Sequence, residues 1–322
     1  MSDIDTTSAP RFASPLFPRA SRYHPDWIAA TISGGANSLW LTEWLATAMD
    51  LRPGMRVLDL GCGLAASSIF LHREFGVHVW AADLWFDAAQ NLQRVRDAGA
   101  EHGVTPVHAD ARALPFDDDF FDAIVSIDSF FYYGTDDLYL NYLARFVKPG
   151  GQIGIAGAGL MQEVDGAVPE YLRAWWTPDL WCLHSASWWR RHWGRTGIVD
   201  VEVADSMPDG WLRWLDWHRA IAPDNATEIR ALEADRGRYL GYVRVIGRRN
   251  GATELGEHTV SVQTEYTQAP LLRDPPSASS DATAITPGST APPRPSGPRP
   301  PAPATAPARR ARRPPAPRSA AD

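Results

Sequence analysis

The chain has 322 residues, a net charge of −7 and two cysteines, Cys62 and Cys182. Two cysteines exclude the disulfide framework of a small secreted protein, and the lack of an 18-residue apolar run argues against a transmembrane helix. We therefore expect a cytoplasmic protein without membrane insertion, and no cysteine and histidine spacing predicts a metal site.

The first predicted element is a strand over residues 57–60, which ends at Gly61 and Gly63 and leads into a helix-forming segment. Glycine lets the backbone pass close to a ligand, and the start of the next helix offers unpaired N–H groups there. A second apolar run, residues 77–82, ends at Asp83, whose carboxylate can accept hydrogen bonds from a ribose diol. This combination predicts a site for a nucleoside-containing cofactor.

The residue before the glycine turn separates two classes of cofactor. Gly61, Gly63 and Ala66 also fit the dinucleotide fingerprint G-x-G-x-x-G/A, which leaves an NAD-dependent oxidoreductase as an alternative. Asp59 would place a negative charge where a pyrophosphate binds, but it suits the ammonium group of a methionine moiety. S-adenosylmethionine (SAM) carries that ammonium and a sulfonium and has no phosphate. The sequence therefore favours SAM.

The next elements alternate between helix and strand. Helices are predicted over residues 86–97 and 138–147, and strands over residues 106–109, 121–128, 152–156 (after a turn at 148–151), 199–204 and 239–247. Two of these strands end at acids, Asp110 before Ala111 and Asp128, and an acid at the first of these ends can accept from an adenine amino group. The alternation predicts an α/β fold with a doubly wound, mostly parallel sheet, helices on both faces and the ligand at the carboxyl ends of the strands.

Tryptophan is concentrated in the second half, where nine of the 14 lie between Trp175 and Trp217. Trp188, Trp189 and Trp193 fall in a predicted helix over residues 187–195, and Trp211, Trp214 and Trp217 share one face of another. One interpretation is that these rings pack helices onto the sheet. The other is an aromatic pocket for an amine or ammonium group, with contributions from Trp175, Trp176 and Trp181.

Residues 57–63, Asp83, Asp110-Ala111, residues 121–128 and residues 148–151 follow the order and spacing of the class I SAM-dependent methyltransferases. The chain resembles this family, in its small-molecule (type 11) form, over residues 30–250. The resemblance implies a Rossmann-like, seven-stranded sheet with an antiparallel last strand. It also implies a ribose contact at Asp83, an adenine contact at Asp110 and a SAM or substrate contact at Asp128. The full set of implied cofactor-binding residues is Ser33, Asp59, Gly61, Gly63, Asp83, Leu84, Asp110, Ala111 and Asp128.

A narrower resemblance concerns the active-site lid and the catalytic residues. Residues 32–35 look like the lid sequence of phosphoethanolamine-type N-methyltransferases. Those enzymes place a histidine after the fourth strand and pair it with a tyrosine near the N-terminus. Here Tyr132 takes the histidine position, and Tyr23 and His24 lie upstream, so the chain departs from that pattern. Tyr132 and His184 are the catalytic candidates, with Tyr133 and His24 as further options for a base, which is needed only if the nucleophile arrives protonated.

We expect three regions, an N-terminal extension or lid over residues 1–30, a methyltransferase domain over 31–250 with an insert at 157–187 above the active site, and a tail over 251–322. Residues 270–322 hold 15 of the 27 prolines, eight arginines and three aspartates, so they carry +5 and are expected to be disordered. Their arginine cluster at 309–313 either contacts anionic surfaces or has no function.

The net charge outside this tail indicates which class of substrate the protein can bind. Because the whole chain carries −7 and residues 270–322 carry +5, residues 1–269 carry −12, which argues against a nucleic-acid substrate. The predicted function is methyl transfer from SAM to a small-molecule acceptor, with an amine nitrogen favoured over oxygen or carbon. A SAM-binding module without catalysis is the alternative from another class.

Overall fold

The computed structural model describes residues 12–31 and 36–256, and residues 1–11, 32–35 and 257–322 lie outside the described part. Seven of its strands form one sheet in the order β3-β2-β1-β4-β5-β7-β6. The strands are β1 (Arg56–Leu60), β2 (His78–Asp83), β3 (Val104–His108), β4 (Phe121–Ile127), β5 (Val147–Leu160), β6 (Val199–Ser206) and β7 (Leu240–Arg249).

The sheet is mostly parallel, as predicted. Strands β1 to β5 pair in parallel, while β7 pairs antiparallel with both β5 and β6. The chain runs outward from β1 to β3 and then returns to place β4 on the other side of β1. Such a reversal leaves a crevice at the carboxyl ends of the two central strands, which is where ligands bind in open α/β sheets.

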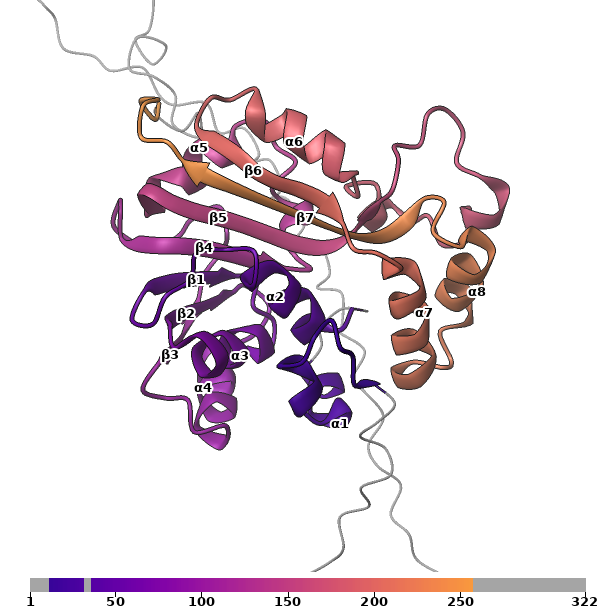
Figure 1. The fold of residues 1–322 in the computed structure, drawn as a ribbon, viewed down its shortest axis with the longest axis horizontal. Coiled ribbons are helices and arrows are strands. Elements are labelled where there is room, and N and C mark those ends of the chain that lie inside the picture. The colour runs from indigo at the N-terminus through magenta and orange to yellow at the C-terminus, as the bar shows by residue number, and fades with distance from the viewer. Residues whose placement is uncertain (1–11, 32–35, 257–322) are drawn as a thin grey trace, which may run out of the picture. The chain divides into compact units, whose positions relative to one another are not determined.

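Helices cover both faces of the sheet (Figure 1), and the two predicted tryptophan-rich helices are present. In Figure 1, α2, α3 and α4 lie on one side of the sheet and α5 and α6 on the other. The helices are α1 (Pro25–Ala29), α2 (Ser38–Ala46), α3 (Ala66–Phe75), α4 (Ala88–Asp97), α5 (Tyr139–Leu143), α6 (Ala186–Gly194), α7 (Gly210–Ile221) and α8 (Ala226–Asp235). Within the described ranges, no helix is long and apolar enough to cross a membrane.

Two elements differ most from their predicted bounds, whereas the others shift by about one to three residues at an end. The predicted turn at residues 148–151 lies inside β5, where Val147 pairs with Phe121 and Gln152 already pairs with Ala123, so the turn is an excursion within one strand. The same strand continues to Leu160, so the predicted insert begins with four residues of sheet. The helix predicted over 138–147 is shorter, because α5 passes into a 3-10 turn after Leu143.

The tryptophans of α6 and α7 mostly pack the fold together. Trp189, Trp193 and Trp217 are fully buried, and Trp193 contacts the Phe130 ring edge-on with a centroid separation of 5.8 Å. Trp217 in turn packs against Trp40 of α2. For these residues the packing interpretation is confirmed, whereas Trp175 and Trp214 also line a cavity described below.

Candidate functional site

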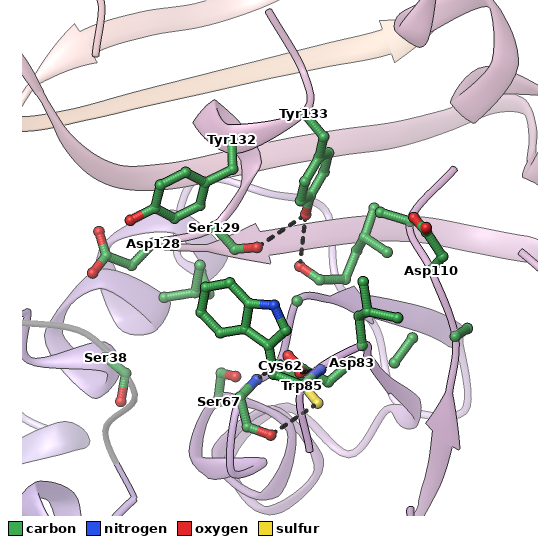
Figure 2. Close-up of a pocket in the computed structure, with 18 of the residues that line it drawn as sticks. Ser38, Cys62, Ser67, Asp83, Trp85, Asp110, Asp128, Ser129, Tyr132 and Tyr133 are labelled. Carbon is green, nitrogen blue, oxygen red and sulfur yellow. Dashed lines mark hydrogen bonds between the residues drawn. The ribbon is translucent and has the colours of Figure 1, made fainter. Parts of the chain in front are cut away.

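The main cavity has a volume of about 500 Å³ and opens at the carboxyl ends of β1, β2, β3 and β4. Figure 2 shows Asp128, Ser129, Tyr132 and Tyr133 along one side, Cys62, Ser67 and Asp83 on the opposite side, and Trp85 between them. The wall also includes Arg112 from the loop after β3, and Thr31, Ser38 and Asp179 from three other segments. This is the place where the reversal of strand order predicts a ligand site.

The glycine turn after β1 forms the floor of this cavity. Gly61 and Gly63 have left-handed backbones, with φ values of +73° and +56°. A Cβ atom added to Gly61 would lie 1.9 Å from Ser129 Oγ and 2.6 Å from Ser129 Cβ. The turn therefore needs glycine at position 61 for its conformation and for the close approach of the Ser129 side chain.

Two carboxylates at neighbouring strand ends reach the same cavity. Asp83 Oδ2 accepts from the Gly63 N–H at 2.8 Å, and Oδ1 accepts from the Trp85 N–H at 2.7 Å. Asp110 Oδ1 accepts from the Arg112 N–H at 2.8 Å. Asp83 Oδ1 also accepts from the Phe86 N–H at 3.2 Å, so the lone pairs left for a ligand lie on Asp83 Oδ2 and on the Asp110 carboxylate. Leu84 and Ala111, which follow these acids, also line the cavity.

Asp59 lies behind the cavity wall and is completely buried. Its Oδ2 accepts from the hydroxyls of Ser67 and Ser68, each at 2.6 Å, while Oδ1 has no hydrogen-bond partner among the described residues. Burial raises the pKa of this carboxyl to about 6, against the lowering effect of the two serines and with a further raising effect from Asp83. Ser67 lines the cavity and Asp59 does not, so Asp59 touches the cavity only through the hydroxyl of Ser67.

A smaller cavity of about 200 Å³, which we call the side chamber, adjoins the main cavity. The two share Ala36, Trp85, Asp128 and Tyr132 as lining residues. The rest of the side chamber is formed by Phe131, Ala158, Trp175, Leu180, Leu183, Trp214 and Glu228. A molecule in the side chamber would thus meet a molecule in the main cavity beside Asp128 and Tyr132.

Tyr132 and His184, the two catalytic candidates, have different positions. Tyr132 lines both cavities, and burial together with the negative charge of Asp128 raises its pKa to about 12. His184 lines neither cavity. Its Nδ1 lies 3.0 Å from Glu163 Oε2, and its ring stacks on Trp188 with a centroid separation of 3.7 Å. The structure brings Tyr132 to the site and does not bring His184 there.

Other predicted positions lie elsewhere. Ser33 and the rest of the predicted lid at 32–35 fall outside the described residues. Tyr23 donates to Glu74 Oε1 at 3.0 Å, and His24 caps the start of α1. Neither lines a cavity with Tyr132, so the proton-handling pair of the phosphoethanolamine-type enzymes is not assembled. Among the tryptophans of the insert, Trp175 lines the side chamber, whereas Trp176 and Trp181 do not.

The sequence reasoning missed several residues of the side chamber. Glu228 lies on α8, about 100 positions after Asp128, and its approach to that residue depends on how α8 folds back over the sheet. Trp85 follows Asp83 and Leu84 directly and stands 75% exposed between the two cavities. The signal available in the sequence was a large aromatic residue two positions after a predicted ribose-binding acid.

The main cavity fits SAM on several independent features. Carboxylates at the ends of β2 and β3 match a ribose diol and an adenine amino group. The buried Oδ1 of Asp59 leaves negative charge without a partner beside the glycine turn, where a ligand ammonium would be stabilised. Arg112 is the one basic residue of the described wall, so the glycine turn offers no side-chain cation to a pyrophosphate. The donor and acceptor groups present thus suit SAM better than a dinucleotide.

Comparisons with known proteins agree with this geometry. Residues 57–151 match the family described as methyltransferase domain. The chain is 35% identical over 134 residues to methyltransferase GfsG of Streptomyces halstedii, which covers 40% of this chain and 48% of that protein. It is 27% identical to a glycine/sarcosine/dimethylglycine N-methyltransferase of Actinopolyspora halophila over 50% of this chain and 28% of that protein. The chain thus spans half or less of the length of these curated relatives.

A solved structure supports the same fold. Geranyl diphosphate C-methyltransferase from Streptomyces coelicolor A3(2), in complex with S-adenosyl-L-homocysteine, superposes with a TM-score of 0.54 at 20% identity, covering 65% of this chain and 78% of that one. At this identity the likeness shows the fold alone. SAM is the cofactor of this domain type. Residues 57–151 therefore belong to the methyltransferase domain family, and the sheet around them has the class I SAM-dependent methyltransferase architecture.

Proposed function

We propose that the chain transfers the methyl group of SAM to a small-molecule acceptor, with an amine nitrogen favoured over oxygen or carbon. The observation that carries this proposal is the junction of the two cavities. Asp128, Tyr132 and Trp85 line both the main cavity and the side chamber. A cofactor in the first and an acceptor in the second would meet at these residues, which is the arrangement that direct group transfer requires.

The proposed cofactor contacts follow the lining residues. Asp83 accepts from the ribose hydroxyls, with Leu84 beside the sugar, and Asp110 with Ala111 receives the adenine. Gly61 and Gly63 let the methionine end of SAM approach the backbone. The negative charge of Asp59, which lies behind Ser67, stabilises the ammonium group of that methionine end. Ser33, in the predicted lid, stays a proposed contact outside the described residues.

Methyl transfer mainly requires the chain to align the acceptor nitrogen with the methyl group of SAM. When bound, SAM supplies an electrophilic methyl group, and its transfer forms the N–C bond while the C–S bond breaks and leaves its electron pair on sulfur. With its raised pKa, the Tyr132 phenol stays protonated at neutral pH, so it donates a hydrogen bond and does not act as a base. Burial raises the pKa of Asp128, which makes its carboxylate the better proton acceptor for an amine that arrives protonated.

His184 has no part in this proposal. Its imidazole is engaged by Glu163 and by the Trp188 ring, away from both cavities. The domain division at residues 31–250, the contact of the tail with anionic surfaces and a cytoplasmic location stay proposals. The location rests on Cys62 and Cys182, which are both free thiols.

Replacing Asp83 with alanine is expected to weaken SAM binding by ~1–3 kcal/mol, because a charge-assisted hydrogen bond to the ribose is lost. The same change also removes the acceptor of the Gly63 and Trp85 N–H groups. Asp83→Asn is the matched variant, since it keeps one oxygen for the backbone and loses the charge. Titration calorimetry with SAM measures both, and unchanged affinity in a folded Asp83→Ala protein would refute the ribose role.

Incubation of the full chain with methyl-labelled SAM and a pool of small metabolites tests the activity itself. The proposal predicts a labelled product that is absent without the protein. SAM binding without any labelled product would favour the non-catalytic binding module. Tight binding of NAD together with no binding of SAM would instead favour the oxidoreductase.

A further inference from the structure

We propose that the side chamber binds the acceptor as a cationic amine without an acidic group, and that Asp128 and Glu228 determine this specificity. The inference rests on the proposed methyl transfer and names the substrate class of that same site. Three observations carry it: two converging carboxylates, the chemistry of the chamber wall, and the aromatic rings that complete it.

Glu228 is held in a fixed orientation by α7 and by its own helix. Its Oε1 accepts from Trp214 Nε1 at 2.9 Å, and its Oε2 accepts from Asn225 Nδ2 at 3.0 Å. His218 Nε2 lies 3.2 Å from the same Oε2. A carboxylate anchored by three nitrogen groups while it lines a cavity is positioned to meet a ligand.

Asp128 faces the same chamber from the end of β4. Its backbone is left-handed, with a φ value of +54°, and its Oδ1 accepts from the Ala158 N–H at 3.0 Å. Such a conformation costs a non-glycine residue free energy and is concentrated at functional sites. Burial raises the pKa of Asp128, and the negative charge of Glu228, which lines the same chamber, raises it further, so the two carboxylates repel each other.

The described wall of the side chamber has no cationic side chain for an anion. No lysine, arginine or histidine is among the described residues that line the side chamber. A phosphate or carboxylate on the acceptor would therefore be desolvated beside Asp128 and Glu228, and His218, the basic residue that pairs with Glu228, does not line the chamber. A cation in the same place relieves the repulsion between Asp128 and Glu228.

Aromatic rings supply the rest of the recognition. Trp175 and Trp214 meet edge to face with a centroid separation of 5.9 Å, and Trp85 lies 6.5 Å from the Tyr132 ring. Aromatic faces attract ammonium groups, and their area also accommodates an apolar acceptor body. Phosphoethanolamine, glycine and geranyl diphosphate each carry an acidic group. The two carboxylates of the chamber would repel that group, so the chamber does not suit these acceptors.

The test uses a matched pair of probes on the full chain saturated with S-adenosylhomocysteine. Tryptamine and indole-3-propionate share a ring and a two-carbon linker and differ in the charge of the terminal group. Calorimetry is expected to show binding of tryptamine and no binding of indole-3-propionate or phosphoethanolamine. Glu228→Gln is expected to weaken tryptamine binding by about tenfold through the lost charge interaction, with the affinity for S-adenosylhomocysteine unchanged.

Glu233→Gln is the control, because Glu233 lies on the same helix but pairs with Arg219 at the surface. Three results would each overturn the inference. The first is that the acid binds as tightly as the amine, and the second is an unchanged tryptamine affinity in Glu228→Gln. The third is no tryptamine binding up to millimolar concentration. If Glu228→Gln does not fold, the amine and acid pair on the native protein still decides. Failure to bind S-adenosylhomocysteine would count against the proposed function, and the same titration without it would still decide the preference of the chamber.

Discussion

Replacing Gly61 with alanine is expected to destabilise the protein and abolish detectable SAM binding. The new Cβ would lie 1.9 Å from Ser129 Oγ and 2.6 Å from Ser129 Cβ, so the backbone of the loop has to shift. Overpacking of this kind costs about 1–3 kcal/mol, and the left-handed backbone adds about 1–2 kcal/mol for a residue with a side chain. Chemical denaturation and SAM calorimetry on the same preparation measure the two effects.

Gly54→Ala is the matched control for this prediction. Gly54 has a similar left-handed backbone, with a φ value of +83°, but nothing lies within 4 Å of an added Cβ. It is expected to show only the conformational cost and to keep SAM binding. Removing the obstructing side chain, in the double variant Gly61→Ala with Ser129→Gly, is expected to recover part of the lost stability. Equal losses in Gly54→Ala and Gly61→Ala would mean that the contact with Ser129 has no role.

Replacing Asp59 with asparagine is expected to change how the stability of the protein depends on pH. The folded pKa of this carboxyl is about 6, above its ordinary value of 3.8, so the folded state holds the proton more tightly than the unfolded state does. As pH rises from 4 to 6, the unfolded chain ionises first and the folded state loses stability. Above pH 6 the loss is complete, at about 3 kcal/mol.

Asp59→Asn removes this titration and keeps an oxygen for Ser67 and Ser68. Its unfolding free energy, relative to the native protein, is therefore expected to rise between pH 4.5 and pH 7.5. The change with pH is the measurement, because any cost of the amide group itself is the same at both values. A difference that does not vary with pH would show that the buried carboxyl has an ordinary pKa.

Local sequence patterns were sufficient for the cofactor half of the fold. The strand, glycine turn and helix around Gly61 are contiguous, and the acids at Asp83 and Asp110 each follow an apolar run, so short-range chemistry indicates their place. The antiparallel seventh strand came from the family resemblance instead. A strand direction depends on which edges pair, and the residues 239–247 alone do not contain that information.

The acceptor half could be predicted only in part. Trp175 was a candidate for an aromatic pocket, the alternative to packing. Glu228 was not predicted, because α8 reaches the chamber through tertiary packing and not through a motif. His184 illustrates the reverse case. Its residue type suggests a base, but in the fold its ring stacks on Trp188 and its Nδ1 contacts the Glu163 carboxylate. The residue type alone does not tell which neighbours the side chain meets in the fold.

A crystal structure of the full chain with S-adenosylhomocysteine tests the central claim most directly. The account predicts the ligand in the main cavity, with its ribose hydroxyls on Asp83, its adenine near Asp110 and its sulfur facing the side chamber beside Asp128 and Tyr132. A ligand bound elsewhere, or bound in the main cavity with its sulfur turned away from the side chamber, would contradict it.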